Sequence, residues 1–301
     1  MNKVYSGMDT LPIGRADDSI TEGCIVLEGG GWKGLYTLGV LDYLMLQNIN
    51  FRSTVGISAG ALSGLGYVTG QIGWAVRVDL GFRHDRNYCG IGAVRRDHGV
   101  TGFSYLYRDI LKTLPFNKKK FRETEKEFAV GVTNMLTGQI EYLEKGKSNM
   151  SAAVRASATV PYVSRPVVIK GVPYLDGGCA EKIPYSWAES RGEKKVVVVK
   201  TREWAYRRSE KKSLMDSVLY HKYPHFVEAM ARSKNEFNRM TERLEELHRN
   251  GEVFVIAPSK PVEVTRFEGD LEKLGALYWL GYRDMEGQME NLRKYLGEIR
   301  R

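Results

Sequence analysis

The segment between residues 24 and 60 decides the fold, because it contains two apolar runs that each end in a glycine-rich turn. The first is CIVLEGGGWKG (24–34), and the second is STVGISAG (53–60). Each run has the length of a buried strand, and each turn is followed by residues with helical spacing. The segment therefore predicts strand, turn, helix, strand, turn, helix, which is typical of a parallel sheet covered by helices.

The rest of the chain continues this alternation. We expect strands at 24–28 and 51–57 in the segment 24–60, further strands at 128–134, 139–143, 194–200 and 252–258, and a hairpin over 165–178 that turns at Gly171. We expect helices at 34–47, from 58 onward, at 149–158, at 213–250 with a break at Pro224, and at 270–300. Residues 80–125 have weak periodicity and many aromatic and basic side chains, which predicts a loop-rich insertion.

The composition is that of a soluble globular protein, since 43% of the 301 residues are hydrophobic and 27% are charged. The first 20 residues lack an apolar core, and the uncharged stretch 53–76 contains six glycines, so we expect neither a signal peptide nor a membrane span. Cys24, Cys89 and Cys179 are widely spaced, and no Cys/His cluster has metal-ligand spacing. We therefore expect free thiols, no bound metal and a cytoplasmic location.

Much of the net charge of +9 lies in one segment, residues 191–212, which contains nine basic and three acidic side chains. One interpretation is a solvated surface. The other is a face that contacts anionic lipid at the inner membrane surface, where each Lys or Arg contributes about 1 kcal/mol. Nucleic acid is not an expected partner, because no recognised binding module accompanies the charge.

The glycine loop at 29–34 matches the G-x-G-x-x-G dinucleotide pattern through Gly29, Gly31 and Gly34. That pattern also requires an acidic residue about 20 positions on, and QNINFRST (47–54) contains none. Arg52 would suit a 2′-phosphate instead, so an NADP-binding oxidoreductase stays as an alternative.

The second turn, GISAG (56–60), has the G-x-S-x-G pattern of a nucleophile elbow, in which Gly56 and Gly60 let the chain turn sharply and present Ser58. A serine that attacks an acyl carbonyl creates an oxyanion, and main-chain N–H groups must already point at it. Ala59 would supply one donor, and Gly30 and Gly31 would supply others. Together the two turns predict an acyl hydrolase whose glycine loop binds a transient alkoxide.

Such a site also needs a residue that accepts the serine proton. The five histidines (84, 98, 221, 225 and 248) lie in charged helical or loop-rich regions, without a turn that would direct them at a site. Asp176 differs, because it ends an expected strand and is followed by Gly177 and Gly178. An ordinary Asp-Gly turn explains the same residues, so this pattern alone leaves both interpretations open.

GGGWKG (29–34), GISAG (56–60) and DGG (176–178), in this order, resemble the motifs of the patatin-like phospholipase family, and ASATVPY (156–162) resembles the segment before the family's aspartate. The resemblance implies a three-layer α/β/α sandwich with a mostly parallel sheet, here with a helical C-terminal extension. It implies a Ser58–Asp176 dyad without histidine, an oxyanion hole lined by Gly30 and Gly31, and no cofactor. Lys33 stands where the family often has Arg, and lysine lacks the fork with which Arg holds phosphate.

On this basis we divide the chain into a polar leader (1–22), an acyl hydrolase domain (23–200) and a mainly helical extension with one further strand (201–301). The predicted activity is hydrolysis of carboxylic esters of lipids, lysophospholipids included. A basic protein that docks on a membrane or a partner without turnover is the non-enzymatic alternative, and the intact Ser58 and Asp176 argue against it.

Overall fold

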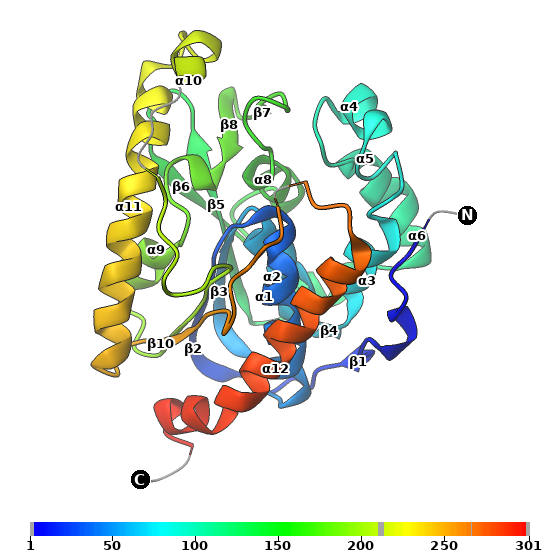
Figure 1. Cartoon of the computed structure of the whole chain (residues 1–301), viewed down its shortest axis with the longest axis vertical. Coiled ribbons are helices and arrows are strands. Elements are labelled where there is room, and N and C mark those ends of the chain that lie inside the picture. The colour runs from blue at the N-terminus through cyan, green and yellow to red at the C-terminus, as the bar shows by residue number, and fades with distance from the viewer. Residues whose placement is uncertain (1–2, 210–213, 266, 299–301) are drawn as a thin grey trace.

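An eight-stranded sheet lies at the centre of the computed structural model, which describes residues 3–209, 214–265 and 267–298 (Figure 1). The strands are ordered β10–β9–β2–β3–β5–β8–β7, with β6 paired to β5. Their bounds are β2 Thr21–Leu27, β3 Phe51–Ile57, β5 Glu127–Asn134, β6 Ile140–Glu144, β7 Val167–Ile169, β8 Val172–Asp176, β9 Val196–Val199 and β10 Phe254–Ile256. A separate two-stranded sheet pairs β1 (Gly14–Arg15) with β4 (Gln71–Ile72).

The strands β10, β9, β2, β3 and β5 are parallel to one another, whereas β6, β8 and β7 run antiparallel to their neighbours. The parallel part is built from the apolar runs of the sequence. All four residues of β9 and the last four residues of β2 are buried. Such continuous burial is expected for parallel strands, which are covered on both faces.

Helices cover both faces of the sheet and give the molecule three layers. On one face, Ile25 and Leu27 share a core with α1 (Gly34–Leu46) and α12 (Leu271–Leu296). On the other face, the alternate residues of β2 share a core with α9 (Tyr185–Ser190) and α11 (Pro224–Arg249). The predicted α/β/α fold with a mostly parallel sheet and a helical C-terminal region is therefore confirmed.

Residues 80–125 form short helices joined by loops at 83–90, 98–102 and 114–117, so the expected loop-rich insertion is right for the loops and wrong for the helices. Each helix is too brief to show a clear period in the sequence. The aromatic residues serve as packing, with Tyr88 and Phe103 in a core of their own. Pro224 begins α11, as its fixed φ favours. The remaining helices are η1 Met8–Thr10, η2 Gly31–Lys33, α2 Ala59–Val68, α3 Trp74–Phe82, α4 Ile91–Asp97, α5 Phe103–Tyr105, η3 Leu106–Ile110, α6 Leu111–Thr113, α7 Lys118–Glu123, α8 Met150–Ser157, η4 Gly177–Cys179 and α10 Leu214–Leu219.

The helices α1 and α12 cross at a contact between backbones. A Cβ on Gly39 would lie 2.0 Å from the carbonyl oxygen of Tyr278, and a Cβ on Gly281 would lie 2.0 Å from that of Tyr36. Next to this crossing, the buried carboxylate of Asp42 accepts hydrogen bonds from Tyr278 Oη (2.9 Å) and from the N–H of Gly73 (2.9 Å). The C-terminal helix is thus fitted closely to the first helix of the sheet.

The segment before β2 packs on the same layer. Ser6 donates from its N–H (2.9 Å) and its Oγ (2.7 Å) to the carboxylate of Glu272, and Leu11 is buried in the core. Cys24, Cys89 and Cys179 are not joined in disulfides. Among the residues that the structure describes, none of the helices has the length and the hydropathy to cross a bilayer.

One edge of β5 pairs with two strands in succession, and this arrangement positions the site. Residues 127–131 of β5 pair with β3, and residues 132–134 pair with β8, while β6 occupies the other edge. Because β3 is parallel to β5 and β8 is antiparallel, the two strands run toward each other. Their last residues, Ile57 and Asp176, lie opposite the neighbouring residues Gly131 and Val132. The two strand ends therefore meet, which brings Ser58 next to Asp176.

Candidate active site

Ser58 occupies a strained turn between β3 and α2, with φ 55° and ψ −120°. A positive φ is uncommon for a residue other than glycine and is found at functional sites. The flanking glycines allow the backbone of the turn to pack closely against neighbouring backbone atoms. A Cβ on Gly60 would lie 2.4 Å from the carbonyl oxygen of Leu27, and a Cβ on Gly56 would lie 2.5 Å from that of Gly60. Both glycines of GISAG are therefore required by close backbone contacts.

The side chains of Ser58 and Asp176 are joined by a hydrogen bond. Ser58 Oγ donates to Asp176 Oδ2 over 2.7 Å, although the residues are 118 positions apart in the sequence. The other carboxylate oxygen, Oδ1, accepts the N–H of Gly178 (2.7 Å), and the carbonyl oxygen of Asp176 accepts Thr133 Oγ1 (2.8 Å). The carboxylate is thus fixed from two sides within reach of a hydroxyl proton.

Ser157 contributes a contact to this turn that the sequence did not reveal. Its buried Oγ accepts the N–H of Ser58 (2.8 Å) and donates to the carbonyl oxygen of Gly131 (2.6 Å). The hydroxyl therefore ties the strained turn to β5 from the end of α8. The only signal in the sequence was the position of Ser157 inside ASATVPY, which does not show what its hydroxyl binds.

The glycine loop presents main-chain donors beside Ser58. Gly30 and Gly31 lie in the loop that joins β2 to α1, and Gly31 has φ 58°. Within the described part of the chain, the N–H groups of Gly30, Gly31 and Ala59 donate no hydrogen bond to protein. Gly30, Gly31 and Ser58 line one pocket, and Gly31, Ser58 and Ala59 line another. All three residues therefore border a pocket that contains Ser58.

The buried carboxylate of Glu28 stabilises the start of this loop. The carboxylate of Glu28 accepts the N–H of Thr201 (2.7 Å), and both Glu28 and Lys200 are buried. Burial raises the pKa of Glu28, which the nearby Lys200 ammonium opposes, and burial lowers the pKa of Lys200. The Lys200 ammonium also lies 4.7 Å from the centre of the Trp204 ring. Lys200 Nζ also donates to Thr241 Oγ1 of α11 (3.4 Å), so its side chain is held on the α11 face of the sheet.

Two pockets meet at Ser58. One has a volume of about 240 Å³ and is lined mainly by apolar side chains, among them Trp32, Leu62, Val94, Val100, Val160 and Phe267. The other has a volume of about 120 Å³ and also contains Asp176 and the glycine loop. The hydroxyl of Ser58 therefore faces an apolar space on one side and a polar space on the other.

Comparison with known proteins places the chain in a family. The patatin-like phospholipase family matches residues 25–188, which is more than half of the 301 residues. The chain belongs to this family. The identity expected from the three glycine-containing motifs is confirmed, and residues 223–297 match a second family, a domain of unknown function (DUF6363).

The chain is similar to several known proteins. The uncharacterized protein YjjU of Escherichia coli K12 is 29% identical over 182 residues, covering 59% of this chain and 51% of YjjU, so the chain spans about half of that relative. VipD from Legionella pneumophila has a TM-score of 0.52 at 15% identity, covering 97% of this chain and 71% of VipD. The type III effector protein ExoU has a TM-score of 0.42 at 13% identity, covering 97% of this chain and 58% of ExoU. At such identity, the likeness to VipD is one of fold.

The other motif residues of this patatin-like phospholipase family member lie in the same two loops. Gly29, Lys33 and Gly178 line the polar pocket with Ser58, whereas Gly34 begins α1 and Gly177 begins η4. All five histidines lie within the described residues, and none lines either pocket that contains Ser58. Arg52 pairs with Glu22 at the start of β3, the opposite end from the glycine loop, because β2 and β3 are parallel. Arg52 is therefore too far from the glycine loop to bind the 2′-phosphate of an NADP held there, and the NADP alternative depended on that contact.

The basic segment 191–212 is largely engaged within the protein. Arg191 pairs with Glu127, and Arg207 pairs with Glu245 (3.0 Å). Lys195 donates to the carbonyl oxygen of Tyr295, and Lys200 is buried. Lys211 and Lys212 lie outside the described residues. The expected contact with anionic membrane through this segment therefore stays a prediction.

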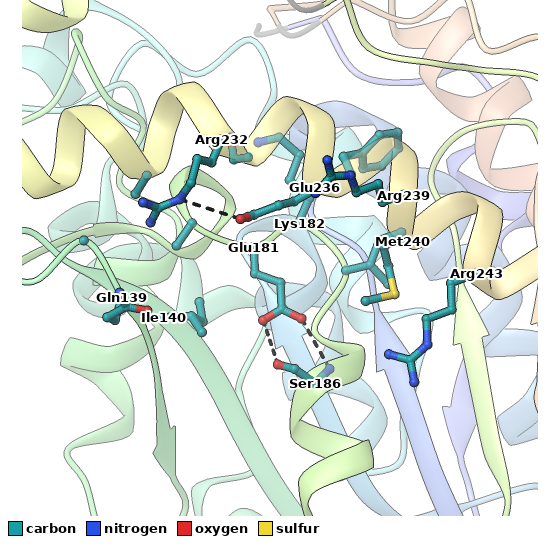
Figure 2. Close-up of a pocket in the computed structure, with 16 residues that line it drawn as sticks. Gln139, Ile140, Glu181, Lys182, Ser186, Arg232, Glu236, Arg239, Met240 and Arg243 are labelled. Carbon is teal, nitrogen blue, oxygen red and sulfur yellow. Dashed lines mark hydrogen bonds and ion pairs between the residues drawn. The ribbon is translucent and has the colours of Figure 1, made fainter.

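A third pocket adjoins the polar one and lies between α11 and residues 180–186, with a volume of about 370 Å³ (Figure 2). Figure 2 shows Arg232 of α11 pointing toward Glu236, and Glu181 toward Ser186. Lys182 and Phe237 line both this pocket and the polar pocket at Ser58, so they form the wall between them. The helix α11 thereby forms part of the boundary of the candidate active site.

Proposed function

We propose that this protein is a serine acyl hydrolase that cleaves carboxylic ester bonds of lipids, with Ser58 as the nucleophile and Asp176 as the proton acceptor. Membership of the patatin-like phospholipase family supports a lipid hydrolase. The observation on which the assignment of residues rests is the 2.7 Å hydrogen bond from Ser58 Oγ to Asp176 Oδ2 at a turn with positive φ. The apolar pocket beside Ser58 supports a substrate with an acyl chain.

In the proposed reaction, Asp176 accepts the proton of Ser58 while Oγ bonds to the carbonyl carbon of the ester. The carbonyl oxygen becomes an oxyanion and accepts hydrogen bonds from the N–H groups of Gly30, Gly31 and Ala59. Collapse of this intermediate breaks the ester C–O bond, and Asp176 returns the proton to the leaving alcohol. Water then attacks the acyl-serine and gives its proton to Asp176. The second collapse releases the fatty acid and restores the serine hydroxyl.

Two substitutions test this assignment. Ser58→Ala removes the nucleophile, and Asp176→Asn keeps the shape of the side chain but cannot accept the proton in the same way. We expect each to lower the hydrolysis of p-nitrophenyl butyrate and of a phospholipid by at least about 100-fold, since general base catalysis alone contributes that much. An unchanged melting temperature would show that the fold is intact.

A fluorophosphonate probe gives an independent measurement, because it reacts with an activated serine. We expect the wild type to be labelled and Ser58→Ala to be unlabelled. If either variant hydrolyses both esters at the wild-type rate, the assignment is wrong. If the wild type is neither labelled nor active, a docking protein without turnover is the better description.

The site of action follows from the substrate. A lipid ester is presented at a membrane or micelle surface, so we propose that the protein works as a cytoplasmic enzyme in peripheral contact with lipid. Contact through the basic residues 191–212 stays a prediction within this proposal.

A further inference from the structure

A short segment of the C-terminal region forms part of the wall of the apolar pocket at Ser58. Phe267 lies between β10 and α12, within residues 223–297 that match the domain of unknown function, and it lines this pocket together with Ser58. Phe267 is also 57% exposed. A residue that lines a pocket and remains exposed lies at its rim, so Phe267 stands between the pocket and the solvent.

We propose that residues 267–269 form a strap that Arg83 holds across the rim of the apolar pocket, so that the C-terminal region sets the length of the acyl chain that the enzyme prefers. The proposal rests on the proposed function, because it takes the apolar pocket as the site of the acyl chain. The match to the patatin-like phospholipase family covers residues 25–188 and does not include the strap. The proposal therefore gives a role to a part of the chain that the family match does not explain.

Two neighbouring side chains at the end of α3 hold the strap. Arg83 donates to the carbonyl oxygen of Glu268 and to that of Phe267 (3.0 Å). Nε2 of His84 lies 2.8 Å from the carbonyl oxygen of Gly269. Figure 1 shows the segment that leads into α12, in orange, passing beside α3. All three carbonyl groups of the strap therefore have a polar partner at the end of α3.

Arg83 is itself held against the pocket. Its guanidinium lies 4.8 Å from the centre of the ring of Trp32, a residue of the glycine loop, and both residues line the apolar pocket. One helical turn earlier, Asp79 lines the same pocket. Burial raises the pKa of Asp79 to about 7, and the hydrogen bond from Tyr88 and the nearby Arg83 guanidinium oppose this rise. Arg83 therefore joins the strap to α3 and to the glycine loop.

The strap is also fixed where it enters α12. The carboxylate of Glu268 accepts the N–H groups of Gly269 (3.0 Å) and Asp270 (3.2 Å). The same carboxylate pairs with Lys273 Nζ (3.6 Å) in the first turn of α12. One residue of the strap thus binds Arg83 through its carbonyl group and the start of α12 through its side chain, which defines the position of Phe267 between them.

The size of the pocket gives the expected chain length. Its volume is about 240 Å³, and a methylene group takes up nearly as much space as a water molecule, about 30 Å³. The pocket therefore holds an acyl chain of about eight carbon atoms. The end of a longer chain has to pass Phe267 at the rim, so removal of this ring should allow further methylene groups to be buried.

The experiment measures kcat/KM of the intact protein for the p-nitrophenyl esters of butyrate, octanoate and laurate, which differ only in the acyl chain. One variant is Phe267→Ala, which removes the ring from the rim. Its control is Leu136→Ala, because Leu136 is similarly exposed (52%) in the loop between β5 and β6 and lines neither pocket at Ser58.

The second variant is Arg83→Gln, which removes the guanidinium that holds the strap. Its control is Arg77→Gln. Arg77 lies in α3 as well, and it donates to carbonyl oxygens of a different segment, those of Pro12 (2.6 Å) and Leu11 (2.8 Å). Each substitution therefore releases one segment from α3, but only Arg83→Gln releases the strap.

We expect the wild type to hydrolyse the laurate ester less efficiently than the octanoate ester. Phe267→Ala should raise the ratio of kcat/KM for laurate to that for octanoate about ten-fold, the change that burial of two further methylene groups supplies. Arg83→Gln should raise the same ratio, whereas Leu136→Ala and Arg77→Gln should keep the wild-type ratio. The ratio compares two substrates of one protein, so a general loss of stability or of active enzyme does not change it.

Three results would overturn the proposal. One is a wild-type enzyme that hydrolyses the laurate ester as efficiently as the octanoate ester. Another is a wild-type ratio in Phe267→Ala or in Arg83→Gln. The third is an equal change of the ratio in Arg77→Gln, which would mean that Arg83 acts through α3 in general rather than through the strap. In each case, hydrolysis of p-nitrophenyl butyrate that depends on Ser58 would leave the proposed function standing, whereas no hydrolysis of any ester would refute both.

Discussion

Replacing Ser157 with alanine should destabilise the protein and slow the reaction, although Ser157 takes no part in the proposed chemistry. Its fully buried hydroxyl satisfies two main-chain groups, the N–H of Ser58 (2.8 Å) and the carbonyl oxygen of Gly131 (2.6 Å). A buried polar group left without a partner costs about 1–3 kcal/mol. Two such groups, partly relieved by small movements, give a loss of about 2–4 kcal/mol in the free energy of unfolding.

The melting temperature measures this loss. For a chain of this size, about 1 kcal/mol corresponds to roughly 2 °C, so Ser157→Ala should melt about 4–8 °C below the wild type. The turn at Ser58 should also relax, because its φ of 55° is held by the bond that the substitution removes. The rate of p-nitrophenyl butyrate hydrolysis should therefore fall as well.

Ser63→Ala is the matched control. Ser63 is buried in α2, close to the same turn, but its Oγ donates to the carbonyl oxygen of Ala59 one helical turn earlier (2.9 Å). That carbonyl stands at the start of the helix, where the main-chain N–H four residues on is its usual partner, so the loss should be under about 1 kcal/mol. Equal melting temperatures and equal rates for the two variants would refute the role assigned to Ser157.

Three further substitutions test other parts of the structure. Gly281→Ala should destabilise the protein by at least about 1–3 kcal/mol, because the new Cβ would lie 2.0 Å from a backbone oxygen of α1. Gly287→Ala in the same helix is the control: its Cβ meets nothing within 4 Å and should stabilise the protein by about 0.5–1 kcal/mol. Thermal melts compare the two variants directly. Burial raises the pKa of Asp42 from 3.8 to about 7, so the folded state binds the extra proton between these values and stability falls as pH rises from about 4 to 7. Asp42→Asn should remove that slope, and urea unfolding at pH 5 and pH 8 would show an unchanged slope if the inference is wrong. Glu28→Ala should lower the melting temperature and the ester hydrolysis rate together, because it leaves the buried N–H of Thr201 without its acceptor at the start of the glycine loop; a wild-type melting curve would contradict this.

Much of the sheet could be predicted, because its strands are local patterns. The strand Phe51–Ile57 has the predicted bounds, and α1 ends one residue before the predicted end. The turn with Ser58 could be predicted for the same reason, since strand, glycine pattern and helix are contiguous. Short elements with no clear period, such as α4 and α7, were not predictable from pattern alone.

Contacts between residues that are far apart in the sequence could not be predicted from local sequence patterns. The meeting of β3 and β8 on one edge of β5 depends on register, and the partners of Ser157 lie 99 and 26 positions away. The sequence showed that the segment 191–212 is basic, but it did not show which residues its side chains contact. Sequence alone could not show that Arg207 pairs with Glu245 while Arg208 turns into the pocket.

The crossing of α1 and α12 has a consequence for synthesis on the ribosome. The apolar side of α1 is covered by a helix that begins more than 220 residues later in the sequence. One edge of β2 likewise pairs with β9, which also comes much later in the sequence. Non-local contacts of this kind form late. During synthesis, the apolar surface of α1 consequently stays exposed until Leu271–Leu296 is available to cover it.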